Sequence, residues 1–141
     1  MDPDALFVYG TLQFPDVLRA LIDRIPDASS ATAHGWRVAA LPGQVYPGLV
    51  PADAGTAQGL LMTGLTTEEW QTIDAFEAIG YDLRRLELDN NRRGWAYVCA
   101  PHIEASPQDW SAEEFARQHL HAYIANCAVW RRRHQIDDQA I

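Results

Sequence analysis

The sequence contains no lysine: all 11 of its basic residues are arginine, against 19 acidic residues in a chain of 141. Without a lysine the chain cannot form a Schiff base to pyridoxal or to a carbonyl substrate. It also cannot form a P-loop, because that phosphate-binding loop needs a lysine that reaches the phosphates. These two classes of chemistry are therefore excluded before any motif is considered.

The chain also lacks the features of a nucleic-acid-binding, exported or membrane protein. Its net charge of −8 is opposite in sign to what a nucleic-acid partner requires. The arginine clusters at residues 92–93 and 131–133 are expected at a turn and at a helix end. No apolar run approaches the roughly 18 residues of a membrane span, and the N-terminus lacks the basic start of a signal peptide. We expect one cytoplasmic domain over residues 1–141, with no nucleic acid and no membrane as partner.

Cysteine and histidine are too few and too scattered to suggest a metal site. The five histidines show no zinc-ligand spacing, and His119 and His121 point to different faces of a helix. Cys99 and Cys127 are expected to be reduced, as in an unexported protein, and to pack as small core residues. We therefore expect no metal.

Hydrophobic periodicity predicts strands interleaved with two or three helices, which is typical of an α+β domain. The strands are expected over residues 6–9, 35–41, 58–65, 81–88 and 94–100. The last two form a hairpin with a longer turn, and their alternation changes phase, which predicts a bulge near residues 84–85. The two prolines of residues 45–51 favour an edge strand or a loop. Residues 27–33 are expected to form a surface loop.

Two helices have clear start signals. Pro15 can occupy the first position of a helix whose apolar stripe runs to Ile25. Ser111 and Glu114 are spaced as a capping box, and they predict one long amphipathic helix that includes Cys127.

A third helix carries the most informative residue of the sequence. Thr66 and Glu69 form a capping box that fixes the start of this helix. With Trp70 at the origin and about 100° per residue, Ile73 lies near 300° and Glu77 near 340°, so the carboxylate falls on the apolar arc. Burial and the negative end of the helix dipole both raise the pKa of such a carboxyl. A carboxyl of this kind can take a proton near neutral pH and return it.

Two features of the same helix leave alternatives open. Gly80 permits the helix to end at Phe76, which would turn Glu77 into solvent. Asp74, at about 40° on the same wheel, is expected at the edge of a site rather than as a second catalytic carboxyl.

The turn after the first strand is a second candidate site. Gly10 follows the apolar run and lets the backbone turn sharply and a ligand approach closely. Amide N–H groups exposed between Gly10 and Leu12 can bind an anion or a developing oxyanion. An ordinary transition from strand to loop would give the same pattern.

Taken in order, several short blocks of the chain resemble the gamma-glutamylcyclotransferase-like superfamily, most closely its branch of small avirulence-induced-gene-like proteins. The blocks are LFVYGTL at residues 6–12, YPGLVP at 46–51, GLL at 59–61 and IDAFE at 73–77, with Tyr81 four residues later. Each block is short, but their ordered combination is specific, and the resemblance spans residues 6–125.

The resemblance implies a small mixed β-barrel flanked by helices, with one cavity at its mouth. Characterised members of the superfamily cyclise a gamma-glutamyl compound, which releases 5-oxoproline and an amine or amino acid, and they use no metal and no organic cofactor. The catalytic glutamate of the family falls on Glu77. The substrate-binding loop falls on Tyr9, Gly10, Thr11 and Leu12.

The sequence departs from the family pattern at two places. The glycine that often follows the catalytic glutamate is Ala78 here, with Gly80 displaced by two residues. The arginine often found two residues after the tyrosine is Leu83, with Arg84 and Arg85 just beyond. Both changes concern the pocket for the substrate's side chain and leave the proton chemistry intact.

The hypothesis that follows is an intramolecular aminolysis in which the substrate's own α-amino group attacks its γ-carbonyl and Glu77 carries the proton. Tyr9 and Tyr81 would line the cavity or orient Glu77, and simple core packing explains either tyrosine equally well. Two alternatives stay open: a non-catalytic module that binds a small ligand or a protein, and an amide hydrolase in which Glu77 activates water. The expected partner is a small gamma-glutamyl substrate, and the chain is expected to be a monomer or a homodimer.

Overall fold

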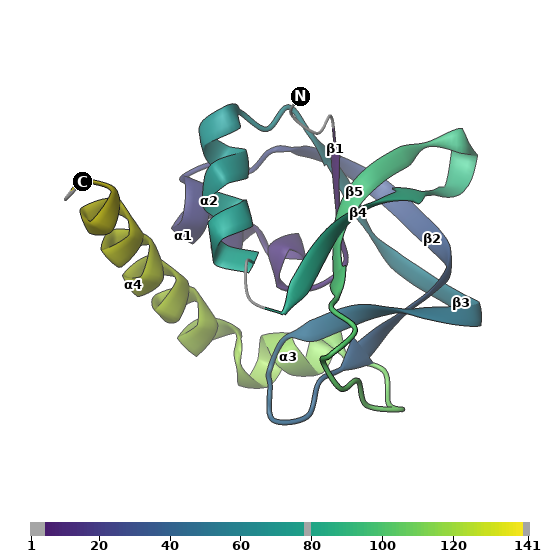
Figure 1. The fold of residues 1–141 in the computed structure, drawn as a ribbon. Helices are drawn as coiled ribbons and strands as arrows, with labels where there is room; N and C mark the ends of the chain where they lie inside the picture. The colour runs from purple at the N-terminus through teal and green to yellow at the C-terminus, as the bar shows by residue number, and fades with distance from the viewer. Residues whose placement is uncertain (1–4, 78–79, 140–141) are drawn as a thin grey trace.

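Five strands and four α-helices make up the part of the chain that the computed structural model describes, residues 5–77 and 80–139 (Figure 1). Residues 1–4, which bear on the signal peptide, and Ala78, which replaces the family's glycine, lie outside the described residues. The elements are β1 (Ala5–Val8), α1 (Pro15–Ile22), β2 (Asp27–Ala40), β3 (Pro47–Thr63), α2 (Thr67–Glu77), β4 (Tyr81–Glu87), β5 (Arg93–Cys99), α3 (Ala112–Gln118) and α4 (Leu120–Gln139). Short 3-10 turns follow β1 at Thr11–Gln13 and β4 at Asp89–Asn91.

The strands form one mixed sheet in the order β2-β3-β1-β5-β4. The central strand β1 pairs antiparallel with β3 and parallel with β5, where Leu6 lies opposite Trp95. The pairs β2–β3 and β4–β5 are antiparallel. The α+β prediction is therefore confirmed, and the sheet is mixed as the resemblance implies.

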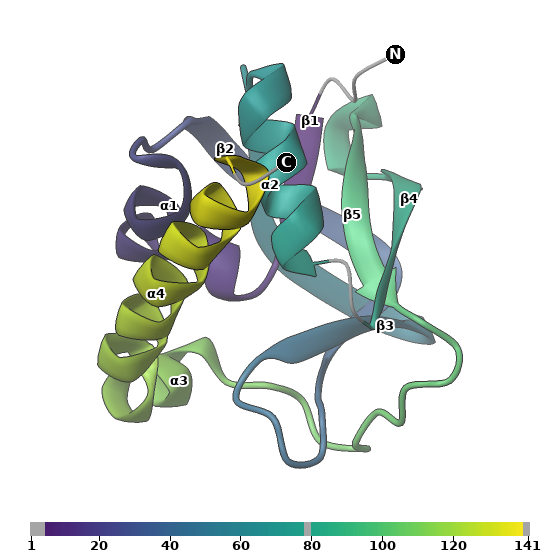
Figure 2. The same cartoon turned by 60° about the vertical axis from the view of Figure 1, so that its left-hand side comes forward.

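Both faces of the sheet are covered by apolar side chains. On one face, Leu6 and Val8 of β1 pack with α1, α2 and α4, which Figures 1 and 2 show on the same side of the strands. On the other face, Phe7 and Tyr9 pack with side chains from the remaining strands, among them Leu86. A four-residue strand that is buried on both faces reads as a continuous apolar run, which is why β1 could be predicted.

The sheet is not closed into a barrel: within the described residues β2 and β4 are its two edges. The turn between β4 and β5 reaches β2 through side chains instead of a ladder. Arg92 donates to the backbone oxygen of Ser30 (2.8 Å), and a carboxylate oxygen of Asp89 accepts from the backbone N–H of Thr32 (3.0 Å). The sheet therefore curls far enough for its edges to meet at this turn.

The prediction of a surface loop at residues 27–33 is wrong, because this segment is the first half of β2. It pairs with the end of β3 from Asp27 opposite Thr63 onward. Ala31 and Ala33 are buried in the core inside the curled sheet, whereas residues 27–30 are exposed. The small, polar composition that suggested a loop thus belongs to an edge strand with only part of its length in the core.

The prolines of residues 45–51 lie at the start of β3, an inner strand of the sheet. This part of β3 pairs with β2, with Pro47 opposite Ala40 and Pro51 opposite Trp36, whereas β1 pairs only with residues 60–63. Among the described strands, the proline-bearing part thus has a neighbour on one side only, so the missing N–H groups interrupt no central ladder.

The hairpin of β4 and β5 is confirmed, but the bulge predicted near residues 84–85 is wrong. The two strands pair in unbroken register from Tyr81 opposite Cys99 to Glu87 opposite Arg93. The change of phase arises because β4 contributes to both cores. Leu83 packs on the helix side and Leu86 on the opposite side.

The long C-terminal helix is divided in two, contrary to the prediction. The capping box at Ser111 and Glu114 is confirmed, since the backbone N–H of Glu114 donates to the Ser111 hydroxyl (3.1 Å). Helix α3 then ends at Gln118, with His119 as its C-cap, and α4 begins at Leu120. The break lets the buried ring of Phe115 pack edge-on against a tyrosine of α4.

The ends of α1 and α4 also differ from expectation. α1 ends at Ile22, with Asp23 in the left-handed conformation (φ 60°), so Ile25 lies beyond the helix and is exposed. Because α4 continues to Gln139, the arginines at 131–133 lie within the helix, where Arg131 forms an ion pair with Asp23 (2.6 Å). No helix in the described ranges has the length and apolar character needed to cross a membrane.

Candidate active site

Helix α2 is held at its start as the sequence predicts. The backbone N–H of Glu69 donates to the Thr66 hydroxyl (3.1 Å), and the Glu69 carboxylate accepts from the backbone N–H of Thr66 (2.9 Å). Trp70 and Ile73 are buried in the helix-side core. The helix extends through Glu77, so the earlier ending at Phe76 is not observed.

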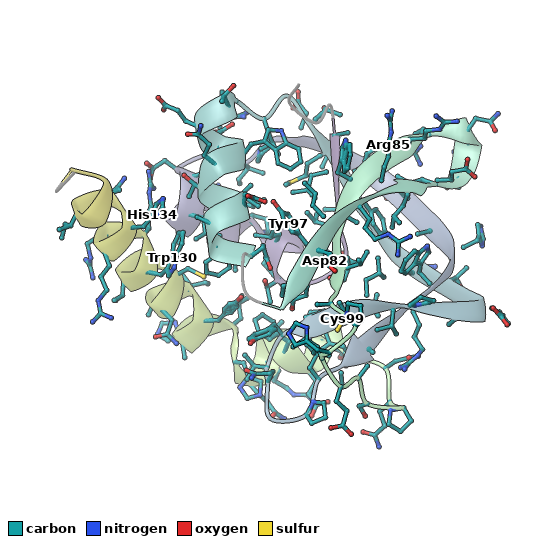
Figure 3. All side chains as sticks on the ribbon, viewed as in Figure 1. Asp82, Arg85, Tyr97, Cys99, Trp130 and His134 are labelled. Atoms are coloured by element: carbon teal, nitrogen blue, oxygen red, sulfur yellow. The ribbon has the colours of Figure 1, made fainter. Side chains whose placement is uncertain are left out.

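A cavity of about 300 Å³ opens at the end of α2. It is bounded by the turn after β1, the start of β3, the middle of β5 and one turn of α4, and Figure 3 places Tyr97 between α2 and the β4–β5 hairpin. The lining residues are Phe7, Val8, Tyr9, Gly10, Thr11, Leu12, Tyr46, Pro47, Phe76, Glu77, Tyr81, Tyr97 and Tyr123. The structure thus brings together every site residue that the sequence predicts.

Glu77 is the only carboxylate among the described residues that line the cavity. Its side chain is half-buried, and no cation or hydrogen-bond donor within the described ranges contacts it. Burial alone raises the pKa of this carboxyl to about 7. A carboxyl with this pKa is poised both to accept and to donate a proton near neutral pH.

Tyr9 and Tyr81 line the cavity, and their hydroxyls donate to backbone carbonyls rather than to Glu77. The Tyr9 hydroxyl donates to the carbonyl oxygen of Tyr97, and the Tyr81 hydroxyl donates to that of Pro47 (2.5 Å). Burial, followed by the negative charges nearby, raises the pKa of both phenols, so they stay protonated. Their hydrogen bonds fix the rings as rigid walls of the cavity.

The turn after β1 packs against the start of β3. A Cβ atom added to Gly10 would lie 2.8 Å from Cγ of Pro47, so glycine is required here by close approach of the two segments. Thr11 is buried, and its hydroxyl donates to the hydroxyl of Tyr123 (3.2 Å). Thr11 and Leu12, at the start of the 3-10 turn at Thr11–Gln13, line the cavity, and their N–H groups have no partner within that turn.

Other lining residues were not predicted as part of a site. Tyr123 lies in α4, four residues before Cys127, and packs against the helix-side core, and Tyr97 alternates within an ordinary strand. The sequence offers one indication that these tyrosines belong to a site: a buried tyrosine hydroxyl needs a hydrogen-bond partner, so a tyrosine in an apolar pattern points to polar groups nearby. Asp74, expected at the edge of the site, is exposed and accepts a hydrogen bond from the Tyr97 hydroxyl (3.1 Å).

Residues 6–116 match the family described as "Gamma-glutamyl cyclotransferase, AIG2-like". The chain belongs to this family. All the cavity-lining residues except Tyr123 lie within the matched range, so α4 completes the wall of the site from outside it.

Relatives in Arabidopsis thaliana support the same conclusion. The chain is 32% identical to AIG2-like protein A over 125 residues, which covers 84% of this chain and 76% of that protein. It is 31% identical to AIG2-like protein B, with 84% and 73% covered.

Solved structures match along most of the chain. The solution structure of an Arabidopsis thaliana protein superposes with a TM-score of 0.68 at 30% identity, with 89% of each chain covered. A gamma-glutamyl cyclotransferase superposes with a TM-score of 0.61 over 89% of this chain and 86% of that one. At 11% identity, this second match shows a shared fold only.

This member of the AIG2-like family carries no arginine at its cavity among the described residues. Leu83, which replaces the arginine of the family pattern, packs with the helix-side core. The guanidinium of Arg84 lies over the ring of Trp36, 5.7 Å from the centroid, on the other face of the sheet. Neither of the arginines that follow Leu83 therefore takes the place of the family's arginine at the cavity.

The described residues of this AIG2-like chain hold no cluster of three or more His, Cys, Asp or Glu side chains that could bind a metal ion. Cys99 and Cys127 are both free. Burial raises the pKa of the Cys127 thiol to about 12, which makes it unreactive as a nucleophile near neutral pH.

Proposed function

We propose that this chain is a gamma-glutamyl cyclotransferase that converts a gamma-glutamyl amine or amino acid into 5-oxoproline and the free amine. The observation that carries the proposal is Glu77, a carboxyl with a pKa of about 7 that faces a cavity large enough for a small substrate. Membership in the AIG2-like family supports the same class of activity.

The proposed reaction needs one proton carrier and no protein nucleophile. The Glu77 carboxylate takes a proton from the substrate's α-ammonium, and the free amine then attacks the γ-carbonyl carbon to close a five-membered ring. As the bond from the γ-carbon to the leaving nitrogen breaks, Glu77 returns the proton to that nitrogen. The ring nitrogen, which carries one proton too many after the attack, passes it to the released amine, so that the products are 5-oxoproline and an ammonium ion and Glu77 is again a carboxylate. A pKa of about 7 suits both transfers, because neither protonation state is strongly favoured.

The rest of the cavity would position the substrate. Backbone N–H groups between Gly10 and Leu12 would hold one of the two anions that the reaction presents, the α-carboxylate or the developing oxyanion. The fixed rings of Tyr9 and Tyr81 would confine the substrate so that its amine and γ-carbonyl meet, which can lower the barrier by several kcal/mol.

Replacing Glu77 by Gln tests the proposal directly. We expect Glu77→Gln to lower kcat for 5-oxoproline release by about 10² to 10⁴, since the amide cannot carry the proton. Release would be measured on a panel of gamma-glutamyl amines and dipeptides. Glu68→Gln, an exposed carboxylate in the first turn of the same helix, is the matched control and should retain wild-type turnover.

The same assay separates the proposal from its alternatives. Wild-type turnover in a folded Glu77→Gln protein would contradict the mechanism. Free glutamate in place of 5-oxoproline would identify an amide hydrolase, and tight binding of the panel without any product would identify a binding module.

A further inference from the structure

Tyr46 lies in the wall of the candidate active site, but its own side chain is not anchored there by a hydrogen bond. Its ring is half-buried, lines the cavity and packs against the ring of Tyr81, with 6.4 Å between the centroids. Within the described ranges the Tyr46 hydroxyl makes no hydrogen bond, whereas the Tyr81 hydroxyl is fixed on the carbonyl of Pro47. The place of the Tyr46 ring therefore depends on the backbone that carries it.

That backbone belongs to the connection between β2 and β3, residues 41–46, which is mostly exposed and takes no part in strand pairing. The chain that follows β5 passes beside this connection (Figures 1 and 2). In the described part of the chain, one hydrogen bond reaches the connection from outside: the indole N–H of Trp110 donates to the carbonyl of Val45 (2.8 Å). Because Val45 directly precedes Tyr46, this bond acts one peptide unit away from the ring.

Trp110 is itself fixed to the body of the protein. Its backbone N–H donates to the carbonyl of Val38 in β2 (3.0 Å), and its ring packs against the ring of Phe115, with 5.5 Å between the centroids. Phe115 is buried in α3, and Ser111, which follows Trp110, caps that helix. The indole N–H is therefore a donor in a fixed place, and the connection between β2 and β3 is held by it.

We infer that Trp110, which does not line the cavity, is a positioning residue for the proposed reaction: its indole N–H holds the β2–β3 connection so that the Tyr46 ring confines the substrate. The inference rests on the proposed cyclotransferase function. A second cavity of about 300 Å³ shares Tyr46 and Tyr81 with the first as lining residues. Without the bond to Val45, the Tyr46 ring is free to leave this shared wall, and a bound substrate loses its contact on that side.

Trp110→Phe removes the indole N–H and keeps an aromatic ring against Phe115. On the panel compound that the wild type turns over fastest, we expect KM to rise about three- to tenfold, the range of one neutral hydrogen bond, with kcat within about twofold of wild type. Partial unfolding would instead lower the apparent kcat and leave KM unchanged, and that result would contradict the inference. Trp36→Phe, at a half-buried tryptophan that does not line the cavity, is the matched control and should keep both constants.

Two further variants test whether the effect passes through Tyr46. In a Tyr46→Ala background, Trp110→Phe should raise KM no further, because the ring that it positions is already absent. Benzothienylalanine at position 110 keeps the shape of the indole and has sulfur in place of the N–H, so it should reproduce the KM of Trp110→Phe without a change in ring size. Rises in KM that multiply fully in the double variant would show that Trp110 does not act through Tyr46, which overturns the inference.

NMR of the folded, ligand-free protein separates failure of this inference from failure of the proposed function, because it needs no turnover. Trp110→Phe should weaken the nuclear Overhauser contacts between the rings of Tyr46 and Tyr81. It should also speed hydrogen exchange about three- to tenfold at the amide of Gln44, which donates to the carbonyl of Leu41 (3.0 Å) within the connection. Unchanged contacts and exchange would overturn the inference and leave cyclotransfer standing. Weakened contacts, with no 5-oxoproline from the wild-type protein on any compound, would overturn cyclotransfer and support Trp110 as the residue that places Tyr46.

Discussion

At the scale of single residues, Glu77 differs from most perturbed carboxyls because no neighbouring charge causes its shift. Burial is the sole cause of the raised pKa. Among the described residues that line the cavity there is no arginine whose positive charge would lower the pKa of Glu77. The tyrosines around it are neutral, so the charge that Glu77 gains and loses is not compensated within the cavity.

The first consequence at this scale is the pH dependence of turnover. Only the ionised form of Glu77 can accept the substrate's proton, so kcat/KM should rise about tenfold per pH unit below about pH 7 and then level. Steady-state rates of 5-oxoproline release between pH 5 and 9 would measure this. A midpoint near the usual glutamate pKa would contradict the role of a buried base.

The second consequence is a dependence of folding stability on pH. The folded pKa of Glu77 is about 7 against a usual value near 4.5, so the folded state holds this proton more tightly than the unfolded chain. Stability is therefore highest below about pH 4.5 with respect to this group, falls as pH rises from 4.5 to 7, and levels above. After allowance for partial exposure, the cost above pH 8 is about 2 to 3 kcal/mol.

Glu77→Gln removes this cost. Urea unfolding should show the variant to be more stable than wild type by about 2 to 3 kcal/mol above pH 8, and nearly equal to it at pH 4.5. A constant difference between the two proteins across this range would show that Glu77 titrates normally.

At the scale of elements, the site depends on how α2 is tied to the sheet. Tyr97 of β5 donates its hydroxyl to Asp74, which lies one turn before Glu77 on α2. Together with the capping box at the other end of the helix, this bond fixes the direction in which the last turn of α2 presents the carboxylate.

A double-mutant cycle on Tyr97→Phe and Asp74→Ala tests this tie. Each single variant should lose only about 1 kcal/mol of stability, because one hydrogen bond is removed and the apolar packing remains. Each should also turn over several-fold more slowly, because the last turn of α2 no longer holds Glu77 in a fixed direction. The double variant should lose little more than either single one, because both remove the same bond. Losses that add fully, measured by urea unfolding and kcat, would show that the two side chains act independently.

The elements also show what could be read from the sequence. An apolar run predicts β1 to within one residue, a capping box predicts the start of α2, and helix geometry predicts the face of Glu77, whereas the end of α2 was left open. The first half of β2 could not be predicted, because its partner, the end of β3, lies about thirty positions away in the chain. For the same reason Tyr46 and Tyr123 were missed as lining residues, since only the tertiary fold brings them to the cavity.

At the scale of the whole molecule, the β4–β5 turn connects the two edges of the open sheet by side-chain hydrogen bonds, where a closed barrel would have backbone pairing between β4 and β2. Arg92 donates to Ser29, Ser30 and Asp89, and these bonds join the β4–β5 turn to β2. This turn lies at the other end of β4 from Tyr81, so it holds the curled sheet together away from the candidate active site.

Arg92→Ala should therefore weaken the fold without changing the chemistry. We expect a loss of about 1 to 2 kcal/mol in urea unfolding, with kcat unchanged at temperatures where the variant is folded. Arg93→Ala, at the exposed first residue of β5, should change stability by no more than about 0.5 kcal/mol. Equal losses of unfolding free energy in the two variants would show that the hydrogen bonds from Arg92 to β2 do not stabilise the fold.

The place of β1 in the sheet has a consequence for synthesis on the ribosome. Of the five described strands, the first in chain order is the central one, yet one of its neighbours is β5, where Leu6 lies opposite Trp95. Until β5 has left the exit tunnel, one edge of β1 stays without a partner, and both of its faces are apolar. The nascent chain thus carries an unpaired strand edge until β5 has been made, and in that interval only β3 and α1, which are made earlier, can cover β1.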